Sequence, residues 1–321
     1  MTAPLFDHYI AVDWSAASRP VRGKDSIWIG VVDRGADERG EARATLSVLE
    51  NPPTRAAATR RLIALAGERL ARGGRTVIGF DFPFGYPAGT AAALGLAGGL
   101  EWRKLWARID ALLSDGENNA NNRFDVGSTL NAAMTGEAFP FWGCPAGREG
   151  PTLAARGRRA RRAGEPAERR ATERRVPSTQ PVWKLAYAGS AGGQALTGIP
   201  RVWQIRTDPA LAFATQIWPF ETGLTDAPAG TIILAELYPS LVAPEAIPGK
   251  PKDAGQVAAV AKALAARDGE GALAPLFLGD PGLDAAARAD VEREEAWILG
   301  VTDRPALTPG DPGAERENHA A

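Results

Sequence analysis

Short apolar runs that end in a carboxylate are the most regular feature of the hydrophobic pattern. Three of these runs end at Asp13, Asp81 and Glu236. Each run is partly β-branched and is followed by a turn-rich stretch, which indicates a buried strand. An ionised carboxylate at the end of such a strand is costly unless a positive charge meets it. We therefore expect the three acids to share a cation, most simply a metal ion.

The wider pattern predicts an α/β order of elements. Strands are predicted at residues 8–13, 26–32, 44–49, 76–80 and 231–237, and helices at residues 54–72, 101–113, 252–267 and 284–299. Thr54 is suited to cap the first helix, whose apolar residues fall on one face. Two hairpins followed by crossovers predict a mixed five-stranded sheet flanked by helices, with the first strand central and the fourth parallel beside it.

The regular alternation of strands and helices lapses after the fourth strand, where Asn-rich, Arg-rich and Gly-rich stretches follow one another. We expect residues 1–87 to form the first part of the core and residues 88–228 to form an inserted cap that faces the substrate. Residues 229–304 would complete the core, and residues 305–321 would form a flexible tail.

Composition narrows the chemistry. The chain of 321 residues contains one cysteine, Cys144, and two histidines, His8 and His319. These counts exclude a thiolate zinc site and argue against a His-rich metal site or a Ser-His-Asp triad, so Cys144 is expected to be a small buried hydrophobe. A metal would be bound by oxygen atoms, as Mg²⁺ and Mn²⁺ are. No apolar stretch reaches the length of a membrane span and no signal-peptide core is present, so we expect a cytoplasmic protein without a membrane partner.

Asp13 and Asp81 are the principal candidates for the chemistry. Ligands of such sheets gather at the carboxyl ends of the strands, where both residues fall. Two neighbouring carboxylates raise each other's pKa, and a bound divalent cation reverses that effect. Each Asp could instead serve a turn at the end of its strand. Glu236 could instead form a salt bridge with an arginine.

A fourth acid is less well defined by the sequence. Asp253 opens the helix that follows the fifth strand, close to the same edge of the sheet. An Asp in the first turn of a helix is also ordinary N-terminal capping. Glu294 and Glu295 are rivals for the same position, although Glu-Glu pairs usually face solvent.

A basic segment interrupts an otherwise acidic chain. Residues 156–175 contain nine Arg and three Glu, whereas the whole chain carries a net charge of −1. Aromatic residues flank the segment: Phe139, Phe141 and Trp142 precede it, and Trp183, Tyr187 and Trp203 follow it. This composition is typical of surfaces that follow a phosphate backbone and stack bases. We predict nucleic-acid contacts from Arg156, Arg158, Arg159, Arg161, Arg162, Arg169 and Arg170. The alternatives are a solvated loop and an aromatic core.

Several short motifs occur in a specific order along the chain. They are residues 11–16 (AVDWSA), 79–85 (GFDFPFG), 122–125 (NRFD), 196–200 (LTGIP), 235–240 (AELYPS) and 294–301 (EEAWILGV). With this order and spacing the chain resembles an uncharacterised bacterial family of predicted ribonuclease-H-like nucleases, over nearly its whole length. The resemblance implies a ribonuclease-H-like fold and a nuclease-like site.

The pattern and the resemblance together favour a metal-dependent phosphodiester hydrolase. Asp13, Asp81, Glu236 and Asp253 would hold one or two Mg²⁺ or Mn²⁺ ions. A pair of ions about 4 Å apart would activate the attacking water and stabilise the leaving oxygen. Lys24 and Lys184 could neutralise phosphate charge, or could simply lie on the surface.

Two other functions remain open from the sequence. A phosphotransferase of the sugar-kinase and actin type shares the sheet order. It requires a glycine-containing turn after the first strand, however, and no glycine directly follows Asp13. A non-catalytic nucleic-acid-binding or regulatory module would keep the fold while its acids serve structure.

Overall fold

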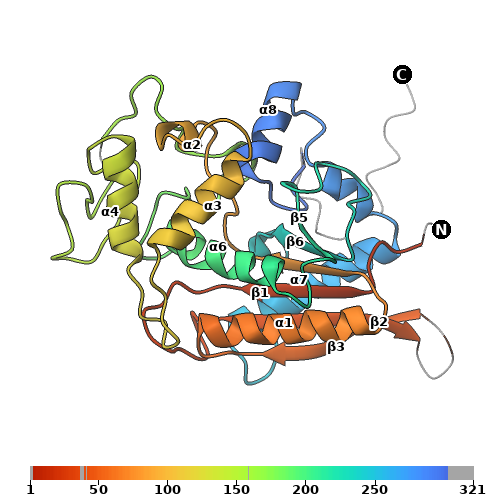
Figure 1. Ribbon diagram of the computed structural model, residues 1–321. Helices are drawn as coiled ribbons and strands as arrows, with labels where there is room; N and C mark the ends of the chain where they lie inside the picture. The colour runs from red at the N-terminus through yellow and green to blue at the C-terminus, as the bar shows by residue number, and fades with distance from the viewer. Residues whose placement is uncertain (1–2, 37–39, 41, 158, 303–321) are drawn as a thin grey trace, which may run out of the picture.

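Six strands form one mixed sheet in the order β3-β2-β1-β4-β6-β5 (Figure 1). The protein was analysed as a computed structural model, which describes residues 3–36, 40, 42–157 and 159–302. The strands are β1 (His8–Asp13), β2 (Trp28–Ala36), β3 (Ala42–Glu50), β4 (Thr76–Phe80), β5 (Thr215–Ile217) and β6 (Ile232–Glu236). β1 pairs antiparallel with β2 and parallel with β4, and β4, β6 and β5 are parallel to one another. The carboxyl ends of β1, β4 and β6 therefore lie at one edge of the sheet.

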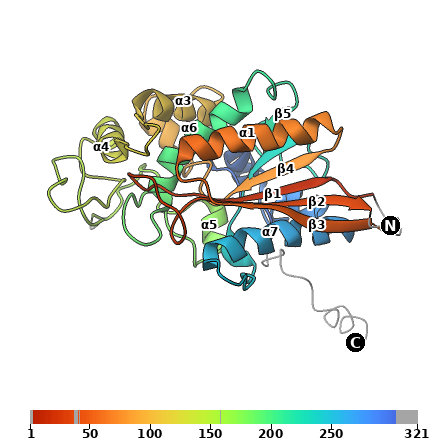
Figure 2. The ribbon, with the colours of Figure 1, turned by 90° about the horizontal axis from the view of Figure 1, so that it is seen from below.

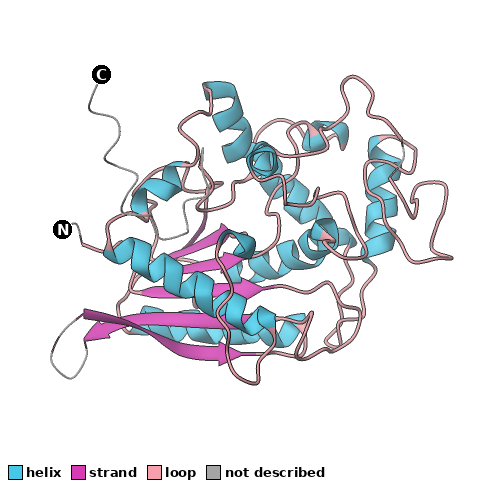
Figure 3. Ribbon diagram, turned by 180° about the vertical axis from the view of Figure 1, so that it is seen from behind, coloured by secondary structure: helices cyan, strands magenta, loops and turns pink. Residues whose placement is uncertain are grey.

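Helices cover both faces of the sheet (Figures 2 and 3). They are α1 (Arg55–Ala71), α2 (Thr90–Ala93), α3 (Glu101–Leu112), α4 (Arg123–Met134), α5 (Ala171–Arg175), α6 (Ala191–Thr207), α7 (Lys252–Gly269) and α8 (Ala285–Asp290), with 3₁₀ turns at Pro239–Leu241 and Ala274–Leu278 and a π turn at Val291–Glu295. α7 packs across β1, β2 and β3 on one face, whereas α1 and α6 pack together on the other. In the described part of the chain, no helix combines the length and the apolar character needed to cross a membrane.

Alternating side chains of the sheet supply two separate cores. Ile10 and Val12 of β1 belong to the core on the side of α1 and α6, whereas Tyr9 and Ala11 belong to the core beneath α7. Successive side chains of a strand point to opposite faces. Even-numbered residues of β1 therefore face α1 and α6, and odd-numbered residues face α7. Asp13 is odd-numbered, so it lies on the side of α7.

The predicted mixed α/β sheet flanked by helices is confirmed, but the predicted number of five strands is wrong. The additional strand is the three-residue β5, which pairs with β6 at the edge of the sheet. β5 lies within residues 88–228, which were expected to form a cap, and α6 from the same segment packs against α1. A strand this short has too few residues to show a period in the sequence. The predicted tail at 305–321 lies outside the described residues.

Thr54 accepts a hydrogen bond from the Ala57 amide and caps α1, as predicted. The helix predicted at 284–299 is shorter than expected, because α8 passes into the π turn at Val291–Glu295 and Ala296 then takes a positive φ of 59°. Residues 123–134 and 191–207 form α4 and α6, which the sequence did not predict. α6 contains three glycines and Pro200, which weaken any helical signal.

Candidate functional site

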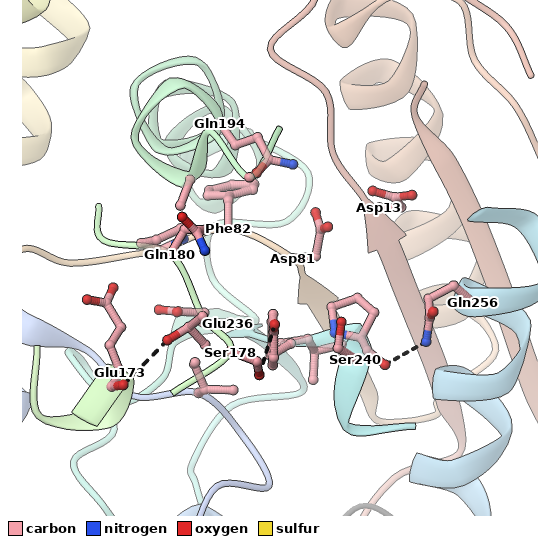
Figure 4. A pocket seen from close by; sticks show the side chains of 18 of the residues that line it. Asp13, Asp81, Phe82, Glu173, Ser178, Gln180, Gln194, Glu236, Ser240 and Gln256 are labelled. Carbon is pink, nitrogen blue, oxygen red and sulfur yellow. Dashed lines mark hydrogen bonds between the residues drawn. The ribbon is translucent and has the colours of Figure 1, made fainter. Parts of the chain in front are cut away.

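A cleft of about 530 Å³ opens at the carboxyl ends of β1, β4 and β6 (Figure 4). Asp13 and Asp81 lie on the sheet side of this cleft. One wall comes from residues 178–194, which lead into α6, and the other from residues 238–240 and the first turn of α7. The cleft therefore lies between the core and the segment that interrupts it. This is where mixed sheets usually bind their ligands.

Asp13 and Asp81 are brought together by the parallel pairing of β1 with β4. Ala11 pairs with Gly79, so the residues two positions further along stand side by side on the face covered by α7. The two carboxyl groups are close enough for each to shift the pKa of the other, and Asp81 Oδ1 accepts the Trp14 backbone N–H at 2.7 Å. Among the described residues, neither Asp has an Arg or Lys ion-pair partner within 4.0 Å. The predicted proximity of the two acids is thus present in the structure.

The electrostatics of the pair follow from this arrangement. The pKa of Asp13 is raised to about 7: burial is the main cause, the interaction with Asp81 opposes the rise, and the neighbouring Asp253 charge adds to it. Burial also raises the pKa of Asp81 well above its usual range, with the Asp13 charge as the next cause. Two such groups titrate as a unit and hold a shared proton near neutral pH. A divalent cation bound between them would replace that proton.

The loop after β1 is held in place by buried contacts. Arg55 at the start of α1 is fully buried, and its Nη1 donates to the carbonyls of Ser15 and Ala17 at 2.9 and 2.8 Å. Gln194 of α6 donates from Nε2 to the Trp14 carbonyl at 2.7 Å. The Trp14 peptide therefore links α6 to Asp81, because its N–H is bound to that carboxylate. These contacts fix the backbone beside the two acids.

Asp253 approaches the pair from the first turn of α7. Its charge contributes to the raised pKa values of both Asp13 and Asp81, so it lies within electrostatic range of each. Its Oδ2 accepts the Asp25 backbone N–H at 2.7 Å. The alternative of ordinary helix capping finds no direct support, because the described hydrogen bond runs to the loop before β2. The N-cap of α7 is Pro251, and no side chain caps the helix there.

Glu236 has a different environment from the two aspartates. Arg170 donates to both of its oxygens, from Nη2 to Oε1 at 2.6 Å and from Nη1 to Oε2 at 2.8 Å, and the Phe84 backbone N–H also donates to Oε2 at 3.0 Å. Both side chains of the ion pair are almost completely buried. The salt-bridge alternative therefore describes Glu236, and the expectation that it joins Asp13 and Asp81 around one cation is corrected.

The register of β6 explains this correction. Phe80 pairs with Glu236, and Phe80 belongs to the core on the side of α6 rather than the side of α7. Leu237 is the residue on the Asp81 face: a Cβ added to Gly79 would lie 2.0 Å from Leu237 Cδ1. A difference of one position moves a side chain to the other face of a sheet. Glu236 therefore lines the cleft from the far side, beside Glu173 in Figure 4.

Glu294 and Glu295, the rivals for the fourth acid, are committed to backbone amides. Glu294 accepts the N–H groups of Gly89 and Ala91, and Glu295 accepts those of Ala88 and Ala171. Both residues are buried, contrary to the usual exposure of Glu-Glu pairs. They hold the segment after β4 and the start of α5, and Asp253 is left as the acid nearest the pair.

The Arg-rich segment is largely neutralised within the protein. Arg159 pairs with Glu137 and Glu165, Arg162 pairs with Glu137, Arg161 donates to the Pro166 carbonyl, Arg169 donates to the Thr179 carbonyl, and Arg170 holds Glu236 and Glu173. Arg156 is exposed, and Arg158 lies outside the described residues. Most of the described side chains in this set therefore make contacts within the protein, and nucleic-acid contact from them stays a prediction.

The flanking aromatic residues belong mainly to the core. Phe139, Phe141 and Trp183 are buried, Trp142 and Trp203 are partly buried, and only Tyr187 among the six is largely exposed. Arg159 and Arg161 stack over Phe139, at 4.1 and 4.8 Å from the ring centroid. These arginines therefore make their aromatic contacts with a ring of the protein itself. Cys144 is buried and free, as expected.

The two lysines considered from the sequence differ in position. Lys24 is exposed and lies 3.9 Å from the Asp25 carboxylate. Lys184 lines the cleft and donates from Nζ to the Ala188 carbonyl at 2.6 Å. Sequence reasoning missed Lys252, Gln194 and Gln256, which also line the cleft. Their only sequence signal is their position near a helix start, and the helix that carries Gln194 was itself not predicted.

The donor set limits which metal site the cleft could form. In the described ranges, no group of three or more His, Cys, Asp and Glu residues is close enough to hold a metal ion. Mg²⁺ is commonly bound through one or two carboxylates while it keeps several waters. The Asp13–Asp81 pair, which has no cationic partner in the described part of the chain and has Asp253 nearby, fits that mode of binding, whereas the Arg170-bound Glu236 does not.

Comparisons of the chain with protein-family models, with curated proteins and with solved structures returned no match.

Proposed function

We propose that the protein is a metal-dependent phosphodiester hydrolase with a ribonuclease-H-like fold. Asp13 and Asp81 would bind Mg²⁺ or Mn²⁺ directly, and Asp253 would complete the site through water or by a small movement of its side chain. The order of β3, β2, β1 and β4, followed by a parallel strand, supports the proposed fold. This proposal differs from the sequence-based one in assigning no ligand role to Glu236.

One observation carries the proposal. Two neighbouring carboxyl groups, which shift each other's pKa, line a cleft at the ends of the two central parallel strands, and no described Arg or Lys pairs with either. A buried ionised carboxylate without a positive partner is costly. Proteins usually avoid this cost, as this one does at Glu236. The presence of two such carboxyl groups at the cleft supports a site that is completed by an external cation.

The roles of the residues follow from their positions. When bound, the metal would supply a water of lowered pKa and would polarise the phosphoryl oxygens. Asp13 and Asp81 would hold it, the Trp14 N–H would orient the Asp81 carboxylate, and Gln194 would fix the Trp14 peptide. Asp253 would increase the negative potential that attracts the cation.

The test compares three single variants with the wild-type protein. Mn²⁺ binding is measured by titration calorimetry, and hydrolysis is measured with bis(p-nitrophenyl) phosphate. Asp13→Asn and Asp81→Asn should weaken Mn²⁺ binding and reduce hydrolysis on the order of 1000-fold, because several kcal/mol of transition-state stabilisation are lost. Asp110→Asn is the matched control, since Asp110 is an exposed acid of α3 outside the cleft.

Other results would favour the alternatives. A wild-type protein that binds oligonucleotides but neither binds Mn²⁺ nor hydrolyses the diester would be a binding module. Thermal stabilisation by ATP without diester hydrolysis would instead indicate the phosphotransferase. Unchanged hydrolysis in Asp13→Asn would reject the proposed site directly.

A further inference from the structure

We propose that the cleft accepts a small phosphodiester, of mononucleotide to dinucleotide size, rather than a polynucleotide. This inference rests on the proposed function and adds the class of substrate to it. It follows from the volume of the cleft, from the contact between its walls, and from the distribution of charge around the two aspartates.

The volume of the cleft suits a small ligand. Pockets that bury most of a small molecule have volumes of roughly 300–1,000 Å³, and this cleft has about 530 Å³. The two walls also meet. Tyr238, which follows β6, donates from its hydroxyl to Ser178 Oγ of the opposite wall at 3.3 Å, and both residues line the cleft. This contact limits the cleft on one side, where a groove for a polymer would continue.

The charges around the cleft also argue against a long polyanion. Five acids line it, Asp13, Asp81, Glu173, Glu236 and Asp253, against three cations, Arg170, Lys184 and Lys252. A protein that follows a phosphate backbone needs many free Lys and Arg side chains, because each contacts one phosphate. In the described part of the Arg-rich segment, Arg159, Arg162 and Arg170 are instead paired with acids, which leaves fewer free cations there.

The cations that remain suit one or two phosphates. Lys252 is the exposed first residue of α7, and it forms no ion pair with any described acid within 4.0 Å. Lys184 uses one of its three N–H groups on the Ala188 carbonyl and has two left for a ligand. The lysines belong to opposite walls of the cleft. They would bind the non-bridging oxygens or a terminal phosphate of a ligand that lies over the aspartate pair.

The experiment compares two substrates of the full-length protein in Mn²⁺ at the same ionic strength. One is a 5′-phosphorylated dinucleotide, and the other is a 24-nucleotide single strand that contains the same linkage. We expect kcat/KM for the dinucleotide to be at least 10-fold higher, and we expect the 24-mer not to inhibit its hydrolysis. Preference for the 24-mer, or competitive inhibition by it at micromolar concentration with a steep dependence on salt, would overturn the inference.

Two lysine variants test the charge argument. Lys252→Met should raise KM for the dinucleotide about 10-fold, since a hydrogen bond to a charged phosphate is lost, and kcat should change little. Lys104→Met is the control, because Lys104 is an α3 lysine outside the cleft that donates to the Ala97 carbonyl. An unchanged KM in Lys252→Met would reject the assignment of Lys252.

Failure of this inference can be separated from failure of the proposed function. If the wild-type protein hydrolyses the 24-mer better, the hydrolase proposal stands and only the substrate class is wrong. If neither substrate is hydrolysed although Mn²⁺ binds, the hydrolase proposal fails. Fluorescence polarisation of both labelled ligands with Asp13→Asn then still measures size selectivity, and tighter binding of the 24-mer there would also reject the small-ligand cleft.

Discussion

Glu236 and the Asp13–Asp81 pair lie at the same edge of the sheet, but their side chains have very different partners. Glu236 is buried with Arg170, which donates to both of its oxygens, and Phe84 supplies a further backbone N–H. Asp13 and Asp81 have each other, one backbone N–H from Trp14, and no described cationic partner. The charge of Glu236 is therefore balanced by Arg170, whereas no described cation balances the charge of the Asp13–Asp81 pair.

The difference separates a structural role from a functional one. Arg170 belongs to the segment that interrupts the core, and its ion pair with Glu236 of β6 attaches that segment to the sheet. The attachment forms one boundary of the cleft that the aspartate pair occupies. We therefore regard the Arg170–Glu236 pair as the support that shapes the site and the Asp13–Asp81 pair as its chemical centre.

The largest effect on stability is expected when the Arg170–Glu236 ion pair is broken. Arg170→Met leaves Glu236 and Glu173 buried without their cation, and breaking a buried pair by removing one partner typically costs about 3–5 kcal/mol. We expect a loss of that size in the free energy of unfolding, measured with urea. The variant should also disturb the cleft, because Arg170 and Glu236 both line it.

A double variant tests whether charge or packing causes this loss. Arg170→Met combined with Glu236→Gln removes the cation and one of the unpaired charges together. It should recover part of the stability lost in Arg170→Met. A double variant that is less stable than the single one by the full effect of Glu236→Gln would show that the two residues do not interact, contrary to the ion pair described here.

The second prediction concerns the Asp13–Asp81 pair, where a substitution should increase stability and not reduce it. Burial raises the pKa of folded Asp13 to about 7, whereas an unfolded Asp has a pKa of about 3.9. Between these values the folded state binds more protons than the unfolded state, so the contribution of Asp13 to stability falls as the pH rises and the cost is complete above about pH 7. Asp13→Asn should remove that cost.

We expect Asp13→Asn to stabilise the metal-free protein by about 2 kcal/mol at pH 8, after allowance for its partial exposure to solvent, and by clearly less at pH 5. Urea unfolding in EDTA at the two pH values measures this difference. Asp110→Asn serves again as the control. Destabilisation by Asp13→Asn to the same extent at both pH values would indicate that Asp13 is satisfied in the fold, as Glu236 is.

A third prediction connects the two pairs to metal binding. A metal must displace the proton that Asp13 and Asp81 share, so Mn²⁺ affinity should weaken about tenfold for each pH unit below 7. Glu236 should not contribute to this pH dependence, because Arg170 already balances its charge. Titration calorimetry at pH 5.5, 6.5 and 7.5 measures the slope. An affinity that is independent of pH in this range would exclude the shared-proton pair as the binding site.

The comparison also shows how far the sequence could be read. The runs that end at Asp13 and Asp81 predicted both their strands and their proximity, because each signal is local and parallel pairing of neighbouring strands then does the rest. The run that ends at Glu236 predicted its strand equally well. It did not reveal the side chain's partner, because the face that Glu236 occupies depends on the pairing of Phe80 with Glu236, which no local pattern contains.

The arginines show the same limit in another form. Arg162 and Arg170 lie in one basic run and look equivalent in the sequence. The structure exposes Arg162 and buries Arg170 almost completely. What separates them is an acid on β6, 66 positions further along the chain from Arg170. Composition identified the charge correctly but could not identify its partners, since those are set by contacts distant in sequence.

The smallest predicted effect follows from that contrast. Arg162→Gln removes an exposed cation whose partner, Glu137, keeps its contact with Arg159. Exposed ion pairs contribute little because water screens both charges and holding long side chains in place costs entropy. The urea midpoint should therefore remain unchanged within error, and so should the affinity for a 24-nucleotide strand. A substantial loss of that affinity would show that the segment presents its arginines to nucleic acid after all, and it would place the functional charge of the molecule outside the cleft; an unchanged affinity would leave Arg170, buried and paired, as the arginine of this segment that matters to the site.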